Sequence, residues 1–184
     1  MADDLYVTAD LHFNHKGIIY HCGRPHESVR EMNEAIIEAW NSTVPRRADI
    51  YVLGDFGFDQ RGDRHTTQEL GALFDRLEGN KHLVIGNHDE ANPAVLKLPW
   101  KTQSHLVSLK RNGLRAVACH YPLLTWKHAH RGWKMLHGHS HGTLRHRHGG
   151  RLDVGWDVFG RPLTLTEACE AAGEYEPVDH HEPK

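Results

Sequence analysis

Five short apolar runs of the sequence each lead directly into side chains of the kind that bind metal ions. In the central run, residues 50–53 are followed by Gly54 and the lone carboxylate of Asp55. An unbroken apolar run of this length indicates a strand buried on both faces, and α/β folds build their sites where such strands end. The sequence therefore predicts a metal site assembled from strand ends, with Asp55 near its centre. The other runs end in Asp10 and His12, in Asn87, His88 and Asp89, in His120, and in His139 and His141.

Histidine stands out in the composition, with 18 copies among 184 residues. Abundance alone does not identify a metal site, so the positions of the histidines decide. Asp10 and His12 can reach one ion together because residues two apart in a strand point to the same side. A single histidine after a strand is most simply a turn residue, whereas four of them, His12, His120, His139 and His141, favour ligation. The others considered are interpreted as surface, tail or satisfied polar residues and left out of the site: His15, His21, His26, His65, His82, His105, His137, His180 and His181.

Two amphipathic helices are predicted between the first three strands. Residues 28–41 begin with Ser28 and Glu31 at capping-box spacing, and Trp40 completes the apolar stripe, which places it in the core rather than on a ligand. A second helix is predicted to begin at Thr66, with Glu69 as the other half of its capping box. Strand, helix and strand in this order predict parallel βαβ organisation.

The second half of the chain carries hairpin signals instead. Asn112 and Gly113 separate two apolar runs and predict a two-residue hairpin turn. A second hairpin is predicted around residues 149–150, with strands over 143–145 and 152–154. Thr164 is predicted to cap a last helix that extends to Ala172. Together these signals predict an α/β fold of two mixed sheets flanked by helices, in a single domain over residues 1–173 with a flexible tail over 174–184.

The composition argues against several classes of protein. A formal net charge of −2 gives no attraction to nucleic acid or to a membrane surface, so no stable nucleic-acid partner is expected. No apolar run reaches the roughly 18 residues of a membrane-spanning helix, and the acidic start of the chain is unlike a signal peptide. Three cysteines without a Cys-x-x-Cys pair argue against a disulfide framework and a zinc ribbon, and favour a cytoplasmic location.

The strand-end motifs follow one another in an order that is specific to one family. All five are present: Asp10-x-His12, Gly54-Asp55, Gly86-Asn87-His88-Asp89, His120, and Gly138-His139-Ser140-His141. On these residues the sequence resembles the calcineurin-like metallophosphoesterases, and most closely their small single-domain prokaryotic and phage members. The resemblance extends over residues 10–166. It implies an αββα sandwich with a two-metal site.

The resemblance also implies a role for each motif residue. Asp55 would bridge the two ions, and His88 would act as an acid or stabilise the transition state. Asp89 would orient the ring of His88, although many relatives carry Glu at this position. The remaining ligands divide into two sets, with Asp10, His12 and His141 around one ion and Asn87, His120 and His139 around the other.

Elementary chemistry agrees with such a site. Two divalent ions about 3.5–4 Å apart clamp the attacking and leaving oxygens of an in-line displacement, and a bridging water becomes hydroxide near neutral pH. Oxygen and nitrogen donors without thiolate favour Mn²⁺, with Fe and Zn²⁺ as alternatives. The neutral Asn87 leaves the site enough positive charge for a phosphate. What the resemblance implies is hydrolysis of phosphodiesters, with a phosphomonoesterase or nucleotidase as the nearest alternative and an inactive scaffold as a further one.

Two segments are candidates for substrate contacts. Asn14 precedes a short predicted helix, and as its N-cap it would direct the positive helix end at a phosphate. In the loop of residues 121–133, Trp126, Lys127 and Arg131 would form a wall that stacks on a base or aryl group and holds a phosphate. A surface loop anchored by its two tryptophans is an equally open interpretation. The expected partner is a small phosphoester, nucleotide-like ones included, and the oligomeric state is left open.

Overall fold

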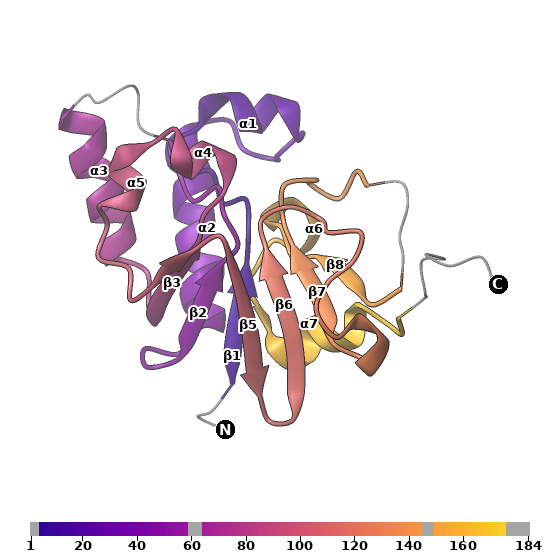
Figure 1. Cartoon of the computed structure of the whole chain (residues 1–184). Helices are drawn as coiled ribbons and strands as arrows, with labels where there is room; N and C mark the ends of the chain where they lie inside the picture. Colours follow the sequence, from indigo (N-terminus) through magenta and orange to yellow (C-terminus); the bar gives the residue numbers. More distant parts are fainter. Residues whose placement is uncertain (1–3, 59–63, 145–148, 176–184) are drawn as a thin grey trace.

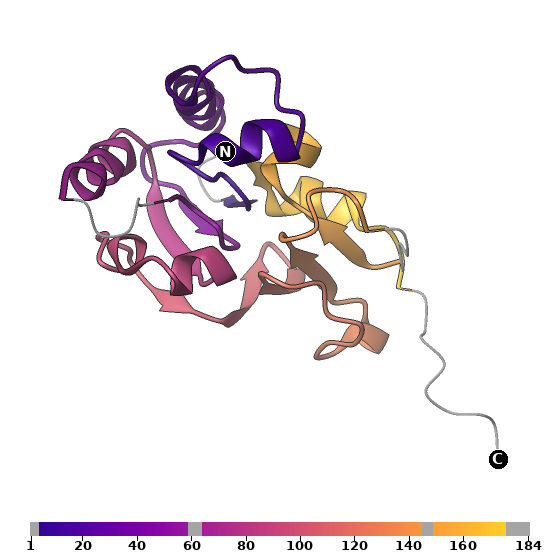
Figure 2. The ribbon, with the colours of Figure 1, turned by 90° about the horizontal axis from the view of Figure 1, so that it is seen from above.

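The computed structural model describes residues 4–58, 64–144 and 149–175. In this part of the chain, two mixed β-sheets lie face to face with helices outside them (Figures 1 and 2). The predicted fold class, an α/β sandwich of two mixed sheets flanked by helices, is confirmed.

The first sheet contains the parallel strands of the predicted βαβ organisation. Its order is β4-β3-β2-β1-β9, and β9 alone runs antiparallel to its neighbour β1. β2 therefore lies in the middle of the sheet, as expected for the run that precedes Asp55. Parallel strands place their carboxyl ends at the same edge, which is where the ligand loops begin. The strands are β1 (Leu5–Thr8), β2 (Asp49–Val52), β3 (Asn80–Val84), β4 (Gln103–Ser104) and β9 (Leu163–Thr164).

The second sheet has the order β5-β6-β7-β8. β5 (Leu106–Arg111) and β6 (Leu114–Cys119) form an antiparallel hairpin. Asn112 and Gly113 take φ of 51° and 82° at its turn, so the predicted two-residue hairpin is confirmed. β7 (Lys134–His137) and β8 (Arg151–Asp153) continue the sheet in parallel with β6.

The second predicted hairpin is wrong. Residues 143 and 144 form no strand, and β8 pairs in parallel with β7 instead, with Leu136 opposite Leu152. Residue 145 lies outside the described residues. The turn signal is real, since Gly150 has φ of 84°. A turn signal of this kind does not say which strand the following residues will pair with. Here the partner is β7, the strand that precedes His139 and His141.

Helix starts agree with the sequence to different degrees. At α2 (Val29–Thr43), Ser28 accepts from the N–H of Glu31 at 3.1 Å, but the Glu31 carboxylate accepts from Glu27 N–H, so only half of the predicted capping box forms. At α7 (Leu165–Ala171), Thr164 and Glu167 form the full box, as predicted. α3 (Arg64–Asp75) begins before Thr66, so the predicted cap there is wrong. The short helices are α1 (Lys16–His21), α4 (Asn87–Glu90), α5 (Pro93–Leu96), η1 (Ala129–Arg131) and α6 (Trp156–Phe159).

Three apolar clusters hold the layers together. One lies between the two sheets and includes Val7, Leu53 and Ala118. A second joins α2 and α3 to the outer face of the first sheet, and it contains Trp40, which is fully buried as predicted. The third covers the outer face of the second sheet with the loop of residues 121–133. Burial of these apolar faces fixes both sheets and so fixes where their strands end.

Three further findings concern membrane spans, the cysteines and the predicted tail. None of the helices among the described residues has the length and apolar character needed to cross a bilayer. The three cysteines, Cys22, Cys119 and Cys169, are free thiols. Tyr175, predicted to belong to the tail, packs edge-on against Trp126 with ring centroids 5.4 Å apart. Residues 176–184 lie outside the described residues, so the tail stays a prediction there.

Candidate metal centre

The loops that follow β1 and β2 run side by side and bring the first three predicted ligands together. Asp10 N–H donates to the carbonyl of Gly54, and His12 N–H donates to that of Asp55, both at 3.0 Å. Asp10, His12 and Asp55 all have φ near 55°. This left-handed region costs energy for residues other than glycine, and such conformations are typical of functional sites.

The ligand atoms of two predicted sets lie close together. Those of Asp10, His12 and His141 are within 4.8 Å of one another, and so are those of Asp55, His120 and His139. In the second set, Oδ1 of Asn87 lies 3.0 Å from Nε2 of His120. All seven residues predicted to hold metal are thus at one place, at the carboxyl ends of strands from both sheets. Their assignment as ligands stays a prediction.

Asp55 lies between the two sets. Its Oδ2 is 3.7 Å from Nε2 of His12 and 3.5 Å from Nε2 of His120. Its Oδ1 accepts from the N–H of His88 at 2.9 Å. One carboxylate therefore faces a histidine of each set, which is the position that a bridging ligand requires.

The ring of His120 is fixed in one orientation. Its Nδ1 lies 2.8 Å from the carbonyl of Leu53, which can only accept, so Nδ1 carries the hydrogen and Nε2 faces Asn87 and Asp55. Gly54 makes this approach possible, because a Cβ there would collide with the His120 ring. Gly138 does the same for Asp10, since a Cβ there would lie 2.7 Å from Oδ2 of Asp10.

Two predicted ligands, His120 and Asp55, have strongly shifted pKa values. Burial lowers the pKa of His120, but the hydrogen bond and charge of Asp55 and the charge of Asp10 raise it to about 9. Burial raises the pKa of Asp55, but the bond to His120 and the charges of His120 and His12 bring it to about 2. Asp55 and His120 therefore each favour the charged form of the other, and metal binding to protonated histidines releases protons.

A buried nitrogen of His12 also indicates that the predicted ligands suit a divalent cation. Nε2 of His12 is buried and has no hydrogen-bond partner, although the residue is only 2% exposed. A buried polar atom without a partner costs free energy, and a metal ion at this position would satisfy it. The donors are carboxylate and amide oxygens and imidazole nitrogens, a combination suited to Mn²⁺, Fe or Zn²⁺.

The carboxylate of Asp89 is bonded to the backbone of the loops that carry the ligands. Its carboxylate accepts from three backbone N–H groups, those of Asp55 at 2.8 Å, Phe56 at 3.0 Å and Gly86 at 2.9 Å. Burial raises the pKa of Asp89 to about 6, and these hydrogen bonds oppose the rise. The described bonds of Asp89 therefore tie the Asp55 loop to the Asn87 loop. The expectation that Asp89 also orients the His88 ring stays a prediction.

Asn14 also differs from its prediction. The N-cap of α1 is His15, and it makes no side-chain capping bond. Asn14 instead pairs with Asn33 of α2, accepting from its amide at 2.7 Å. The prediction that Asn14 caps the helix and directs it at a phosphate is wrong, because its side chain is bonded to a neighbouring helix.

The predicted substrate wall is wrong for Trp126. This side chain is 9% exposed, packs against the outer face of the second sheet, and donates its Nε1–H to the carbonyl of Trp133 at 2.8 Å. Arg131 lines a small cavity beside Gly113, at the opposite end of β6 from His120. The turn η1 that contains it lies at the lower end of the sheet in Figure 1, away from α1 and α4. Lys127 is exposed, and its role stays a prediction.

Three side chains near the cluster were missed by the sequence reasoning, namely His15, Arg24 and Asp157. His15 places Nδ1 3.3 Å from Nδ1 of His12 and stacks on Phe58 with ring centroids 4.8 Å apart. Its spacing of three residues from His12 was the available signal. Arg24 and Asp157 form a buried ion pair beside Asp10 and His141, and no local pattern links residues so far apart.

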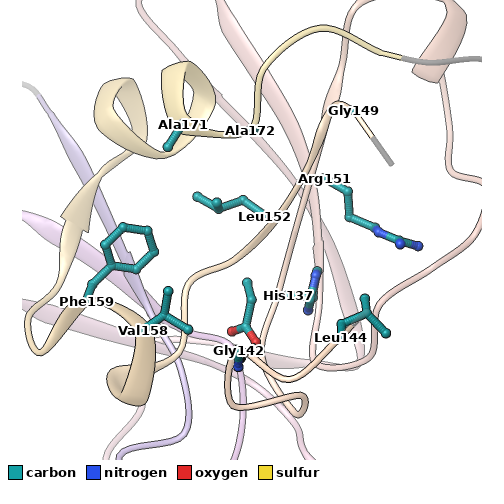
Figure 3. Close-up of a pocket in the computed structure, with 11 residues that line it drawn as sticks. His137, Gly142, Leu144, Gly149, Arg151, Leu152, Val158, Phe159, Ala171 and Ala172 are labelled. Carbon is teal, nitrogen blue, oxygen red and sulfur yellow. Dashed lines mark hydrogen bonds between the residues drawn. The ribbon is translucent and has the colours of Figure 1, made fainter. Parts of the chain in front are cut away.

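A cavity of about 530 Å³ lies elsewhere, between β8, α6 and α7 (Figure 3). Leu144, Leu152 and Phe159 contribute to its apolar lining. His137 also borders it, is 2% exposed, and has Nδ1 2.9 Å from the carbonyl of Gly138. None of the described residues that line it is a predicted metal ligand.

Fold and site together define a two-sheet α/β protein with a candidate metal centre at the ends of its strands. A sequence profile of the calcineurin-like phosphoesterases matches residues 4–164. The chain belongs to this family.

Individual proteins show the same similarity. The chain is 30% identical to protein MJ1445 of Methanocaldococcus jannaschii over 137 residues, which cover 74% of this chain and 69% of that protein. It is 26% identical to the Gene 66 protein of Mycobacterium phage L5, with 88% and 90% of the two chains covered. The crystal structure of AQ665 from Aquifex aeolicus matches with a TM-score of 0.65 and 18% identity, covering 91% of this chain and 98% of that one. This last similarity extends the agreement in fold to nearly the whole chain.

Proposed function

We propose that the protein is a phosphodiesterase that depends on two divalent metal ions. The observation that carries the proposal is the position of Asp55 between two sets of ligand atoms, one of which ends in the unpartnered Nε2 of His12. Family membership supports hydrolysis of a phosphoric ester. The rival role of an inactive scaffold is opposed by this complete set of oriented donors.

The residues present would hold the ions in two groups that share Asp55. Asp10, His12 and His141 form one group, and Asn87, His120 and His139 form the other. When bound, two such ions supply Lewis acidity and activate water for in-line attack on a phosphoester. The mixture of oxygen and nitrogen donors makes Mn²⁺ the preferred candidate, with Fe and Zn²⁺ as alternatives.

His88 is proposed as the acid that protonates the leaving oxygen. Its ring is half-buried at the cluster, with its centroid 5.2 Å from that of His12. Its backbone N–H is held by Asp55 at 2.9 Å, which fixes the residue without engaging the ring. An imidazole is the side chain best suited to donate a proton near neutral pH.

The charge around the site supports a diester rather than a monoester. Among the described residues, Arg24 is the cationic side chain whose hydrogen bonds reach the loop of Asp10. All five of its N–H groups are used, and they donate to Asp157, Asp10, Leu11 and Met32. It therefore has no donor left for a substrate. A phosphodiester carries one negative charge where a monoester carries up to two, so it needs less cationic support from side chains.

A small, nucleotide-like or aryl phosphoester is the proposed substrate class. Tyr121 is 43% exposed, and its ring meets those of His120 and His139 edge-on at 5.0 and 4.9 Å. An exposed aromatic ring beside the ligands can stack on a base or aryl group. The free cysteines support a reducing, cytoplasmic location as part of the same proposal.

A comparison of matched substrates tests the proposed function. Metal-free protein is loaded with Mn²⁺ and assayed with bis(4-nitrophenyl) phosphate and with 4-nitrophenyl phosphate, which share one leaving group. We expect a higher kcat/KM for the diester. A higher kcat/KM for the monoester would establish the phosphomonoesterase alternative. Absence of metal-dependent hydrolysis of either substrate would favour the scaffold.

A further inference from the structure

Arg24 and Asp157 form a buried ion pair beside the cluster. The two side chains are 2% and 8% exposed. Nε of Arg24 donates to Oδ1 of Asp157 at 2.7 Å, and Nη2 donates to Oδ2 at 2.9 Å. A guanidinium and a carboxylate in this fork are held in one relative orientation.

Each partner reaches beyond the pair to a predicted ligand of the same metal ion. Nη2 of Arg24 also donates to the carbonyl of Asp10 at 2.7 Å, and Nη1 donates to that of Leu11 at 2.8 Å. Oδ2 of Asp157 lies 2.7 Å from Nδ1 of His141. One ion pair therefore connects the backbone of Asp10 with the ring of His141, although these two residues are far apart in the chain.

The bond to Asp157 also selects one tautomer of His141. A carboxylate paired with an arginine is ionised and can only accept, so Nδ1 of His141 must carry the hydrogen. Nε2 is then the nitrogen with a free lone pair, and a neutral imidazole ligates through that atom. An acceptor on the opposite ring nitrogen is the usual means of orienting a metal-ligating histidine.

Asp157 is itself on a rigidly placed element. It lies in the first turn of α6, whose first residue, Trp156, is buried and donates its N–H to the carbonyl of Ala9 at 2.8 Å. Ala9 directly precedes Asp10, so α6 is docked on the end of the strand that carries the first ligand. The helix is thus hydrogen-bonded to the strand end that carries Asp10.

We propose that Arg24 and Asp157 are positioning residues that hold His141 in its ligating tautomer and direction and fix the Asp10 backbone beside it. The proposal rests on the proposed metal site but not on the reaction. Neither residue is among the seven proposed ligands. Their loss should weaken the ion that Asp10, His12 and His141 hold, and leave the ion of Asn87, His120 and His139 in place.

Two variants test the proposal. Asp157→Leu removes the hydrogen-bond acceptor of His141. This single variant leaves the charge of Arg24 buried without a partner and could therefore fail to fold. The double variant Arg24→Met with Asp157→Leu removes that charge as well and so keeps the test possible. Arg76→Gln is the matched control, because it breaks an Arg–carboxylate fork with Glu34 that is exposed on the surface. Each protein is studied first without metal and then by calorimetric titration with Mn²⁺.

The first readout is the His141 ring in metal-free protein labelled with ¹⁵N-histidine. We expect a hydrogen on Nδ1 in the parent and the control, and its loss from Nδ1 in the Leu variants. In the titration, we expect one of two binding events to weaken by about 10–100-fold in the Leu variants while the other is unchanged. Unchanged tautomer and unchanged Mn²⁺ affinities in a folded Leu variant would overturn the proposal. If the parent binds no Mn²⁺, the proposed function fails, and the ¹⁵N spectrum still tests whether Asp157 sets the tautomer.

Discussion

At the scale of single residues, Asp55 connects the two halves of the candidate centre. Its oxygens face His12 on one side and His120 on the other, and the Asp55 N–H is held by the Asp89 carboxylate. An imidazole in its place could not serve two ions at once, because its free lone pair is on one nitrogen. The behaviour of Asp55 variants therefore separates a shared ligand from two independent sites.

Replacing Asp55 by alanine is expected to remove both metal ions. The shared carboxylate contributes to both sites, and without it two cations would repel each other at short range. Metal content per chain, measured by mass spectrometry after desalting, should fall from two to none. Asp75→Asn, an exposed carboxylate at the end of α3, is the control and should keep both ions. Retention of two tightly bound ions by Asp55→Ala would show that Asp55 does not bridge.

Replacing His88 by asparagine is expected to leave the metal content unchanged and to lower kcat. The loss should be about 10²–10⁴-fold for substrates with poor leaving groups, the usual contribution of a general acid. It should shrink for 4-nitrophenyl esters, whose leaving group needs little protonation. A series of diesters that differ in leaving-group pKa provides the measurement. An equal loss across the series would instead assign His88 to positioning or charge stabilisation.

The sequence was informative for residues whose role depends on local position. Asp10, Asp55 and His120 each follow an apolar run, so predicting the strand also predicts the position of the side chain at its end. The roles of Asp89 and Asp157 could not be found in this way. Asp89 bonds backbone groups of two different loops, and Asp157 bonds Arg24 and His141, which are distant from it in the sequence or on other elements of the fold.

At the scale of elements, Trp126 and Trp133 make the middle of the loop of residues 121–133 a structural cover, while Tyr121 at its start lies beside the predicted ligands. Trp126 and Trp133 bury the outer face of the second sheet, next to Met135 and Val117. Alternating aromatic and cationic residues fit both interpretations in the sequence. What decides between them is which face the rings meet, and that depends on the sheet that lies beneath the loop.

Replacing Trp126 by alanine is expected to lower the free energy of unfolding by about 3–5 kcal/mol, as for other buried aromatic side chains. Chemical denaturation gives this quantity. The KM ratio between an aryl and an alkyl phosphodiester should not change, because the ring does not face substrate. A selective rise in KM for the aryl substrate, with stability unaffected, would restore the stacking role.

The N-terminus of α7 provides a prediction about pH. Arg161 and the groups of Thr164 lower the pKa of Glu167 to about 2, from an ordinary value of 4.5. A lowered folded-state pKa gives stability that is present above about pH 4.5 and lost as the pH falls toward 2. The difference in unfolding free energy between the parent and Glu167→Gln should therefore shrink over this range. Denaturation at several pH values measures it, with Glu170→Gln in the same helix as the control. A constant difference would show that the charge of Glu167 contributes nothing.

At the scale of the whole molecule, both sheets contribute to one site. β1, β2 and β3 of the first sheet and β6 and β7 of the second each end beside predicted ligands. Apolar runs, helical stripes and the Asn112-Gly113 turn were enough to predict two mixed sheets with helices outside. The direction of β8 was not predictable from the sequence, because it depends on which edge strand of the sheet β8 pairs with, and that strand is β7. The start of α3 was missed because Thr66 offers a plausible cap inside a helix that begins earlier.

The central claim, that two ions are needed for hydrolysis of a phosphodiester, is tested by one titration. Metal-free protein at a concentration far above the dissociation constants is given Mn²⁺ in small steps, and the rate of bis(4-nitrophenyl) phosphate hydrolysis is measured at each step. We predict that the rate rises to a plateau at two ions per chain, since Asp55 joins two sets of ligand atoms. A plateau at one ion per chain, or two bound ions without hydrolysis, would contradict the claim.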